Sequence, residues 1–358
     1  MGTMNLLKFE IKKQVSSLTY MIILGICMVF AISQLNEVFH LPVTTDEDIY
    51  ALEKSGELNY IFKPTTDKEI KEKTIKFLQE QINNASIPAN RVEQLNVVLT
   101  MLQEETNTLD DVIAVYKEDE FVYPWLCVSK EQFSKRYGSV EEVNHNLQRD
   151  VGEEGYSTKL IIKYVSYMQA ISAFLVFPIF LFAMLRDYQH NMFETVYVQP
   201  MSTNKYILCR YFGALLPLIV YLYILGEGLN LISISRFIGA GYKVDYTSFI
   251  TYFMIYLLPT IFFFSGLVTA LMLVVRKVVA VFPIYVLYVI FNITPEAFRF
   301  GTALKMINPI IRLDRQIPSV QYILINRLAY IMLGIILLMV GCKAYKNLRH
   351  DLRKGITL

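Results

Sequence analysis

The sequence predicts an all-α integral membrane protein: six transmembrane helices, an N-terminal amphipathic helix, and a large helical domain inserted between the first and second spans. Of the 358 residues, 54% are hydrophobic and 18% are charged, and the mean hydropathy of +0.38 is too high for an ordinary soluble domain. Charge is also unevenly placed. Residues 41–159 hold 23 acidic and 13 basic side chains, a balance of −10, whereas the whole chain carries +2. An acidic, polar insert therefore interrupts a basic, apolar body.

The first 40 residues predict an amphipathic helix followed by a span. Apolar residues recur at spacings of three and four from the N-terminus, at Met4, Leu7, Ile11, Val15 and Leu18. Charged residues fill the other side, so residues 1–17 are expected to lie on the inner membrane surface. Residues 18–40 then form an apolar run of about 33 Å, enough to cross the hydrocarbon. A signal peptide is the alternative, because the stretch has a basic start and an apolar core.

The insert, residues 41–159, is patterned as helices. Apolar side chains fall on one face of 67–82 and on one face of 90–105, and a third helical pattern covers 110–116. About 120 residues suffice for an independent fold. Cys127 is the only cysteine of the insert, so no disulfide within it is expected.

An aromatic cluster at residues 121–126 surrounds Trp125, the only tryptophan of the chain. We interpret this cluster as core, or as packing at the base of the domain that faces the membrane. A substrate-binding aromatic patch is the alternative. No catalytic combination of residues is found in the insert.

Five further spans are predicted after the insert. They cover residues 160–185, 206–234, 249–275, 278–293 and 322–342. Residues 294–321 do not span, because three prolines and four basic residues interrupt the apolar pattern, and they predict a re-entrant or interfacial hairpin. Residues 343–358 form a basic tail.

The distribution of basic residues predicts the orientation. They gather in the N-terminal helix, in the loop at 186–205, at Arg276 and Lys277, and in the C-terminal tail. The positive-inside rule makes that side cytoplasmic, with both termini there and residues 41–159 outside. The basic residues of the outer hairpin are exceptions to the rule: Arg299, Lys305, Arg312 and Arg315.

The loop at 186–205 is a polar break between two strongly apolar segments, and it is too polar to cross a bilayer. Residues 194–198 predict a short amphipathic helix that Pro200 ends. Ser202 is placed to cap the helix that starts near Lys205.

This loop resembles the first cytoplasmic loop in permeases of ATP-binding-cassette (ABC) transporters of the type-2 exporter family. The shared pattern is an acidic residue and Thr, a short apolar stretch, Pro, a small polar residue, then an aromatic and a basic residue. It is carried here by Glu194, Thr195, Val196, Val198, Pro200, Ser202, Tyr206 and Arg210. The family more often has Gly before the acidic residue and Lys in place of Arg210. A plain interfacial connector is the alternative.

The resemblance implies that the loop is a coupling helix that docks on an ATPase. The residues expected to make this contact are Phe193, Glu194, Thr195, Val198, Pro200, Ser202, Tyr206 and Arg210. It also implies two copies of a separate ATPase subunit, which would carry ATP and Mg²⁺, and a second permease chain, identical or homologous. The family shows a hairpin between its last two spans as well.

The sequence contains no G-x-x-x-x-G-K-[ST] motif, so P-loop nucleotide binding on this chain is excluded. No cofactor, metal site, nucleic-acid partner or enzymatic chemistry is expected of it. The expected function is export of an amphiphilic peptide, drug or lipid across the cell membrane, for example efflux of an antimicrobial peptide or drug. The alternative is a membrane sensor or force-transmitting subunit whose outer domain binds a partner without transport.

Four polar residues are candidates for the substrate path: Glu37, Glu227, Asn230 and Arg327. Glu227 lies inside a predicted span, where an unpaired charge is costly; we favour a position near the outer, water-accessible end of its helix. Glu37 and Arg327 have two interpretations, an ion pair across the outer mouth or ordinary interfacial placement. The second is favoured.

Overall fold

The computed structural model describes residues 3–55, 62–83, 88–104, 106–151, 155–189, 201–293, 308–311, 313 and 319–353. The chain forms two compact units. Residues 1–39 and 151–358 make up the first, here called the membrane unit, and residues 40–150 make up the second, here called the inserted unit. This unit starts within one residue of the predicted insert at 41–159 and ends nine residues before its predicted end.

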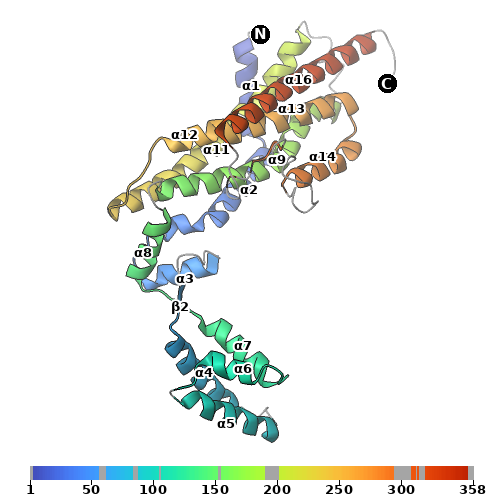
Figure 1. Ribbon diagram of the computed structural model, residues 1–358. Helices are drawn as coiled ribbons and strands as arrows, with labels where there is room; N and C mark the ends of the chain where they lie inside the picture. Colours follow the sequence, from blue (N-terminus) through green and yellow to red (C-terminus); the bar gives the residue numbers. More distant parts are fainter. Residues whose placement is uncertain are drawn as a thin grey trace. The chain divides into compact units, whose positions relative to one another are not determined.

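The membrane unit is a bundle of long apolar helices (Figure 1). In chain order they are α1 (Thr3–Val15), α2 (Leu18–Gln34), α9 (Tyr156–Gln189), α11 (Thr203–Gly239), α12 (Ser248–Tyr252), α13 (Leu258–Val275), α14 (Val278–Ile293) and α16 (Val320–Arg353). A 3₁₀ turn, η1 (Asn36–Phe39), follows α2, and a π-helical turn, η2 (Phe253–Leu257), joins α12 to α13.

Four of the described helical segments are long and apolar enough to cross a membrane: Tyr156–Leu185, Thr203–Gly239, Ser248–Val275 and Val320–His350. The pair α1 and α2, bent by 65°, counts as a fifth if it is taken as one span. The 16 residues of α14 extend about 24 Å, short of the roughly 30 Å of hydrocarbon. The chain is therefore a multi-pass membrane protein, and the count of six spans stays a prediction.

Two helices of the membrane unit run further than their apolar stretches. The sequence predicts a span that ends at residue 234, but α11 continues to Gly239, and α16 continues from the predicted end at Cys342 to Arg353. The reason is that hydropathy marks only the part of a helix that is apolar enough to contact lipid, whereas the helix itself continues until a helix-breaking residue such as proline or glycine ends it. No proline or glycine follows Gly341 within α16.

Glycines set the closest helix contacts of the membrane unit. A Cβ atom on Gly266 of α13 would lie 2.8 Å from the carbonyl oxygen of Gly334 on α16. A Cβ on Gly213 of α11 would lie 2.6 Å from the Cβ of Glu10 on α1. Small residues let helices approach to backbone contact in membranes, where apolar burial alone provides little driving force.

The face of α1 that packs on the bundle is partly polar. Its buried residues are Leu6, Glu10 and Gln14, whereas Met4 and Val15 are exposed. Met4 and Val15 of the predicted apolar face therefore do not pack on the bundle, and α1 contacts α11 through the adjacent face that carries Leu6, Glu10 and Gln14.

Tyrosine hydroxyls link the helices. Five interhelical hydrogen bonds join Tyr20 to Ala214 O (3.3 Å), Tyr221 to Leu24 O (2.6 Å), Tyr164 to Leu222 O (2.5 Å), Tyr285 to Ala173 O (2.5 Å) and Tyr211 to Ser265 Oγ (2.8 Å). Each satisfies a phenolic hydroxyl that would be costly to bury unpaired in an apolar bundle. Together with the glycine contacts, they fix the lateral order of the helices.

The inserted unit contains α3 (Asp46–Ser55), α4 (Asp67–Ile82), α5 (Ala89–Gln103), α6 (Leu109–Val115), α7 (Val122–Phe133) and α8 (Val140–Val151). Its core lies between α4, α5, α6 and α7 and is built by Leu78, Leu95, Val98, Leu102 and Leu126, among others. The rings of Phe77 and Trp125 lie 5.8 Å apart at this core. The aromatic cluster therefore packs within the domain, as interpreted from the sequence.

The sequence patterning missed one feature of the inserted unit, a short antiparallel pair of strands. β1 (Phe62–Pro64) pairs with β2 (Lys135–Tyr137), so that Phe62 lies opposite Tyr137. Three-residue strands carry too little alternation to be recognised by period.

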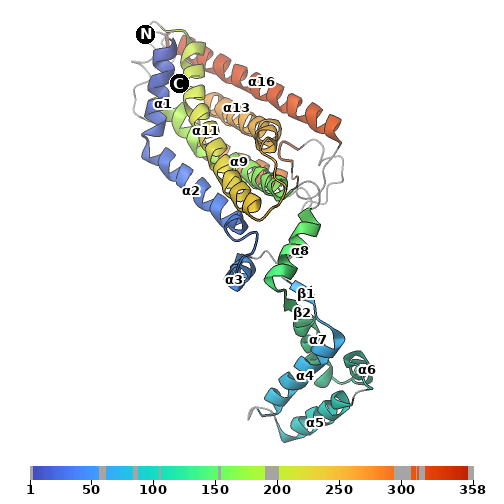
Figure 2. The same ribbon diagram turned by 90° about the vertical axis from the view of Figure 1, so that its left-hand side faces the viewer.

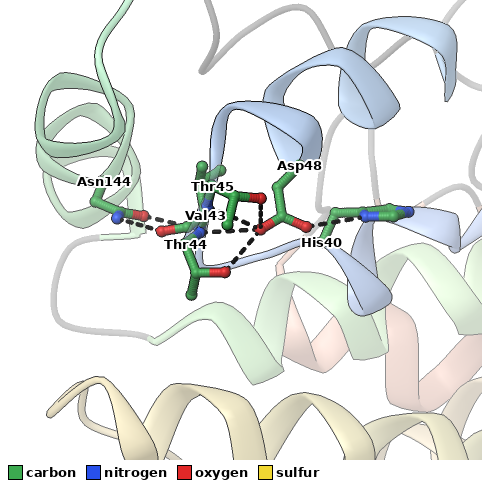
Figure 3. Close-up of polar contacts among 6 residues, drawn as sticks. All are labelled: His40, Val43, Thr44, Thr45, Asp48 and Asn144. Atoms are coloured by element: carbon green, nitrogen blue, oxygen red, sulfur yellow. Dashed lines mark hydrogen bonds and ion pairs between the residues drawn. The ribbon is translucent and has the colours of Figure 1, made fainter.

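Asp48 organises the start of α3 (Figure 3). Its Oδ2 accepts hydrogen bonds from the N–H groups of Thr44 (3.0 Å) and Thr45 (3.2 Å), and its Oδ1 lies 3.2 Å from His40 Nδ1. Burial raises the pKa of this carboxyl, but the hydrogen bonds from Thr44, His40 and Thr45 outweigh it and hold the pKa below its ordinary value. Asn144 of α8 joins the same segment through two hydrogen bonds to the backbone of Val43.

We predict that Gly266→Ala lowers the melting temperature of the purified protein in neutral detergent. The added methyl group meets the Gly334 backbone, which cannot rotate away, so α13 and α16 must separate, at a cost of about 1–3 kcal/mol. Gly228→Ala is the matched control, because nothing lies within 4 Å of its added Cβ. Equal melting temperatures for the two variants would contradict close helix contact at Gly266.

We predict that Asp48→Asn destabilises the inserted unit by about 1 kcal/mol at neutral pH. Because the folded pKa of Asp48 is depressed, its contribution is present above the unfolded pKa of about 3.9 and is lost as pH falls through the folded pKa. The gap between wild type and variant should therefore close in acid. Fluorescence of Trp125, the single tryptophan, reports on this unit alone. Glu47→Gln is the control, and a gap that does not narrow as pH falls below about 3.9 would refute the role of Asp48.

Candidate functional site

Two places in the membrane unit bring predicted site residues together, and the first is the start of α11. Of the predicted coupling residues, Phe193, Glu194, Thr195, Val198 and Pro200 lie outside the described residues.

The other three predicted coupling residues are Ser202, Tyr206 and Arg210. Ser202 occupies the N-cap position of α11, as expected, but its hydroxyl makes no capping hydrogen bond. Arg210 is buried, and its Nη1 donates to the Tyr206 hydroxyl at 2.8 Å. The guanidinium also stacks over the Tyr206 ring, 5.0 Å from its centroid. The basic residue of the sequence pattern thus stiffens the first turns of α11.

Arg349 fastens the end of α16 to the chain that enters α11. Its Nη1 donates to the Met201 carbonyl at 2.7 Å and to Thr203 Oγ1 at 3.3 Å. Tyr345 lies one turn earlier on α16 and faces Tyr206, with ring centroids 6.0 Å apart. The starts of α1 and α11 and the end of α16 therefore meet at one end of the membrane unit (Figure 2).

A cavity of about 490 Å³ opens at this end. Its lining combines residues just before and at the start of α11 with basic side chains of α16: Met201, Ser202, Thr203, Asn204, Lys346, Arg349 and His350. The N-terminus of α11 adds the positive end of a helix dipole. The basic side chains of α16 and the N-terminus of α11 therefore make this cavity favourable for negatively charged groups.

Glu37 is buried and pairs with Lys163 of α9, whose Nζ donates to Glu37 Oε2 at 2.8 Å. The suggested pair of Glu37 with Arg327 is wrong. Lys163 lies two turns into α9 and close to the predicted start of the span at 160, where hydropathy treats a basic residue as an ordinary interfacial anchor.

Glu227 belongs to a polar stripe within α11. The helix continues beyond it to Gly239, so Glu227 is not near the helix end as we had favoured, and its side chain is half-buried. Asn230 and Ser233 follow on the same side and are 1% and 0% exposed. Glu227 Oε2, both polar atoms of Asn230 and Ser233 Oγ find no hydrogen-bond partner among the described residues.

The second group of predicted site residues in the membrane unit is centred on Arg327. This arginine lies two turns into α16 and is 3% exposed, so interfacial placement is wrong as well. Its Nη1 donates to Thr260 Oγ1 at 2.9 Å, the Pro309 carbonyl at 3.0 Å and the Tyr256 carbonyl at 3.4 Å. Tyr256 is in the π-helical turn η2. Arg327 thus joins α16 to the distorted part of the apolar segment Ser248–Val275 and to the segment at 308–313.

The described residues of the segment 308–313 are non-helical, and they are held by side chains of α9, α13 and α16 and by a backbone carbonyl of α14. Gln169 of α9 pairs with Ile311 in both directions, donating to its carbonyl and accepting from its N–H, each at 3.0 Å. Ser166 Oγ accepts from the N–H of Leu313 at 3.2 Å. Asn308 donates to the Asn292 carbonyl of α14.

Sequence reasoning missed Gln169 and Ser166, although a signal was present. Both are polar, they stand three residues apart inside an apolar run, and that spacing puts them on one helix face. Paired polar residues in a span generally meet a partner, because lipid provides none.

Within the described ranges, no group of three or more His, Cys, Asp or Glu side chains comes together in a way that would hold a metal ion. Comparisons with known proteins find no match for this chain among protein-family models, curated proteins or solved structures.

We predict that Gln169→Leu lowers the melting temperature in neutral detergent more than the matched exposed control Gln321→Leu. The variant leaves the N–H and carbonyl of Ile311 without partners, at about 1–3 kcal/mol for each buried group. The segment at 308–313 should also become accessible, so a cysteine placed at Leu313 should react faster with a maleimide. Unchanged melting and labelling would show that the pairing is not a significant restraint.

Proposed function

We propose that this chain is the permease subunit of an ATP-driven ABC exporter that moves an amphiphilic peptide, drug or lipid out of the cell. The observation that supports this best is the junction of α1, α11 and α16. The chain that emerges from the predicted coupling loop is hydrogen-bonded to Arg349 of α16, and α11 is in backbone contact with α1 at Gly213. A displacement of this loop would be passed to three helices at once.

In this proposal the chain performs no bond chemistry. ATP and Mg²⁺ belong to two copies of a separate ATPase subunit, which docks on the loop at 186–205. A second permease chain, identical or homologous, completes the pathway. Both termini face the cytoplasm and the inserted unit lies outside the cell, in the plasma membrane, consistent with the basic residues at the ends of the chain.

Polar side chains of this chain would provide hydrogen-bonding groups along an otherwise apolar substrate path. The stripe of Glu227, Asn230 and Ser233 on α11 and the guanidinium of Arg327 on α16 retain unused hydrogen-bonding groups. An amphiphile needs such groups for its head and apolar surface for its tail.

A second candidate function is a membrane sensor or force-transmitting subunit. It is favoured by the inserted unit, which has its own core and forms a compact unit distinct from the helices of the membrane unit. Such a subunit would bind a partner through residues 40–150 and relay ATPase motion without moving a substrate. Uptake by vesicles containing the reconstituted complex separates the two: ATP-dependent substrate accumulation supports export only.

We predict that Glu194→Lys, and deletion of Phe193–Val198, release an ATP-hydrolysing subunit that co-purifies with the wild-type chain from its native membrane. Charge reversal opposes docking at the loop, while membrane insertion does not depend on these residues. Mass spectrometry of the purified complex and its ATPase activity provide the measurements. Glu118→Lys makes the same change at an exposed site of the inserted unit and should retain the subunit. Retention of an ATPase by both loop variants, or its absence from the wild type, would rule out the proposal.

A further inference from the structure

We propose that Arg327 binds the anionic group of an amphiphile, a carboxylate or a phosphate ester, through the N–H of Nε and one N–H of Nη2, two atoms that find no acceptor among the described residues. This assignment rests on the proposed function, to which it adds the charge of the substrate. It is carried by the hydrogen-bond geometry of one buried side chain.

The guanidinium of Arg327 is used on one edge only. Its Nη1 donates to Thr260 Oγ1, Pro309 O and Tyr256 O, whereas Nε and Nη2 are buried and have no hydrogen-bond partner among the described residues. In a guanidinium, the Nε–H and one N–H of Nη2 point in the same direction and form a fork. This fork matches the two oxygens of a carboxylate or phosphate.

The charge of Arg327 is also uncompensated. At 3% exposure it is shielded from water, and no carboxylate in the described part of the chain forms an ion pair with it. Its acceptors are two carbonyls and a hydroxyl, and the Tyr256 ring, whose centroid lies 5.9 Å away, adds only a partial negative charge. Ionisable residues inside membrane helices pair with an opposite charge or mark a functional site.

The fork is held in place before any ligand arrives. Thr260, which accepts from Arg327, itself contacts Gln169 Oε1 at 3.2 Å and Pro309 O at 2.9 Å. Fixing the donors in advance lowers the entropy lost on binding. Arg327 is therefore arranged as a receptor group and not as a mobile surface charge.

The surroundings on α16 explain why the ligand is an amphiphile. Ile325 and Leu328, close to Arg327 in the sequence, are 68% and 63% exposed and belong to the apolar outer surface of α16. An alkyl tail can lie along this outer surface, but because Nε and Nη2 are buried, the head group must enter between α16 and its neighbours to reach the fork. An inorganic anion would gain nothing from this apolar surface.

Binding of defined probes to the full-length chain, purified in a neutral detergent, tests the proposal by native mass spectrometry. The probes are dodecyl phosphate and dodecanoate; dodecanol has the same tail without the charge, and inorganic phosphate has the charge without the tail. We expect saturable binding of the two anionic amphiphiles, much weaker binding of dodecanol and inorganic phosphate, and no need for ATP.

Arg327→Lys keeps the positive charge but removes the fork, so the affinity for both anionic probes should fall about tenfold, as for the loss of one charge-assisted hydrogen bond. Arg236→Lys, the same exchange near the end of α11, is the matched control and should bind as the wild type does. Equal affinities of wild type and Arg327→Lys would overturn the proposal. If Arg327→Lys does not fold, the wild-type comparison decides: dodecanol or inorganic phosphate binding as tightly as dodecyl phosphate overturns it.

The chain's own carboxylates provide the competing occupant. Glu296 and Asp314 stand on either side of the segment at 308–313 in the sequence and lie outside the described residues. If one of them fills the fork, Glu296→Gln or Asp314→Asn should raise the affinity for dodecyl phosphate about tenfold, and this result would overturn the proposal. Unchanged affinity in both variants supports it.

The test separates this inference from the proposed function. Probe binding is measured without an ATPase, so a chain that binds dodecyl phosphate at Arg327 but recruits no ATPase would refute only the exporter. A chain that recruits the ATPase but shows no preference for anionic amphiphiles would refute only the role of Arg327.

Discussion

The constraint on which the membrane unit depends is that an irregular stretch of backbone in an apolar bundle must find hydrogen-bond partners within the protein. Lipid supplies none, and each unsatisfied group costs several kcal/mol. The described residues of the segment 308–313 meet this constraint through Gln169 and Ser166 of α9 and through Arg327 of α16. The positions of these helices are therefore tied to one another by a segment that belongs to none of them.

The same constraint explains the distortion next to this segment. Pro259 cannot donate a backbone hydrogen bond, and the π-helical turn Phe253–Leu257 directly precedes the helix that contains it. The carbonyl of Tyr256 in that turn accepts from Thr260 Oγ1 at 3.0 Å and from Arg327. The distorted turn thus becomes part of a polar centre made by Gln169, Thr260, Pro309 and Arg327, because side chains from α13 and α16 donate to its Tyr256 carbonyl.

Features that depend on residues close together in the sequence could be predicted, whereas contacts between helices far apart in the sequence could not. Local periodicity predicted α4 with its exact bounds, 67–82, and it predicted the bounds of α5 and α6 to within two residues. These helices could be predicted because each of them buries one face, which leaves a helical period in its own sequence. The ion pair of Glu37 with Lys163 and the burial of Arg327 are set by which helices become neighbours. Hydropathy treats every charge near a span end as interfacial, so it could not distinguish Arg327, which is enclosed, from residues that remain at the surface.

One helix, α16, carries both Arg327 of the polar centre and Arg349, which binds the chain that follows the predicted coupling loop. In the proposed exporter, α16 is therefore the helix that would transmit motion from the loop to the polar centre. Among the four long apolar segments of the described chain, three contain a proline, at Pro178, Pro217 and Pro259, whereas α16 contains none. Arg349 and Arg327 are 22 residues apart on it, which corresponds to about 33 Å of uninterrupted helix. Gly334 lies between the two and holds α16 in backbone contact with α13. A displacement at Met201 would therefore reach the guanidinium of Arg327 through a rod that has no proline hinge to absorb it.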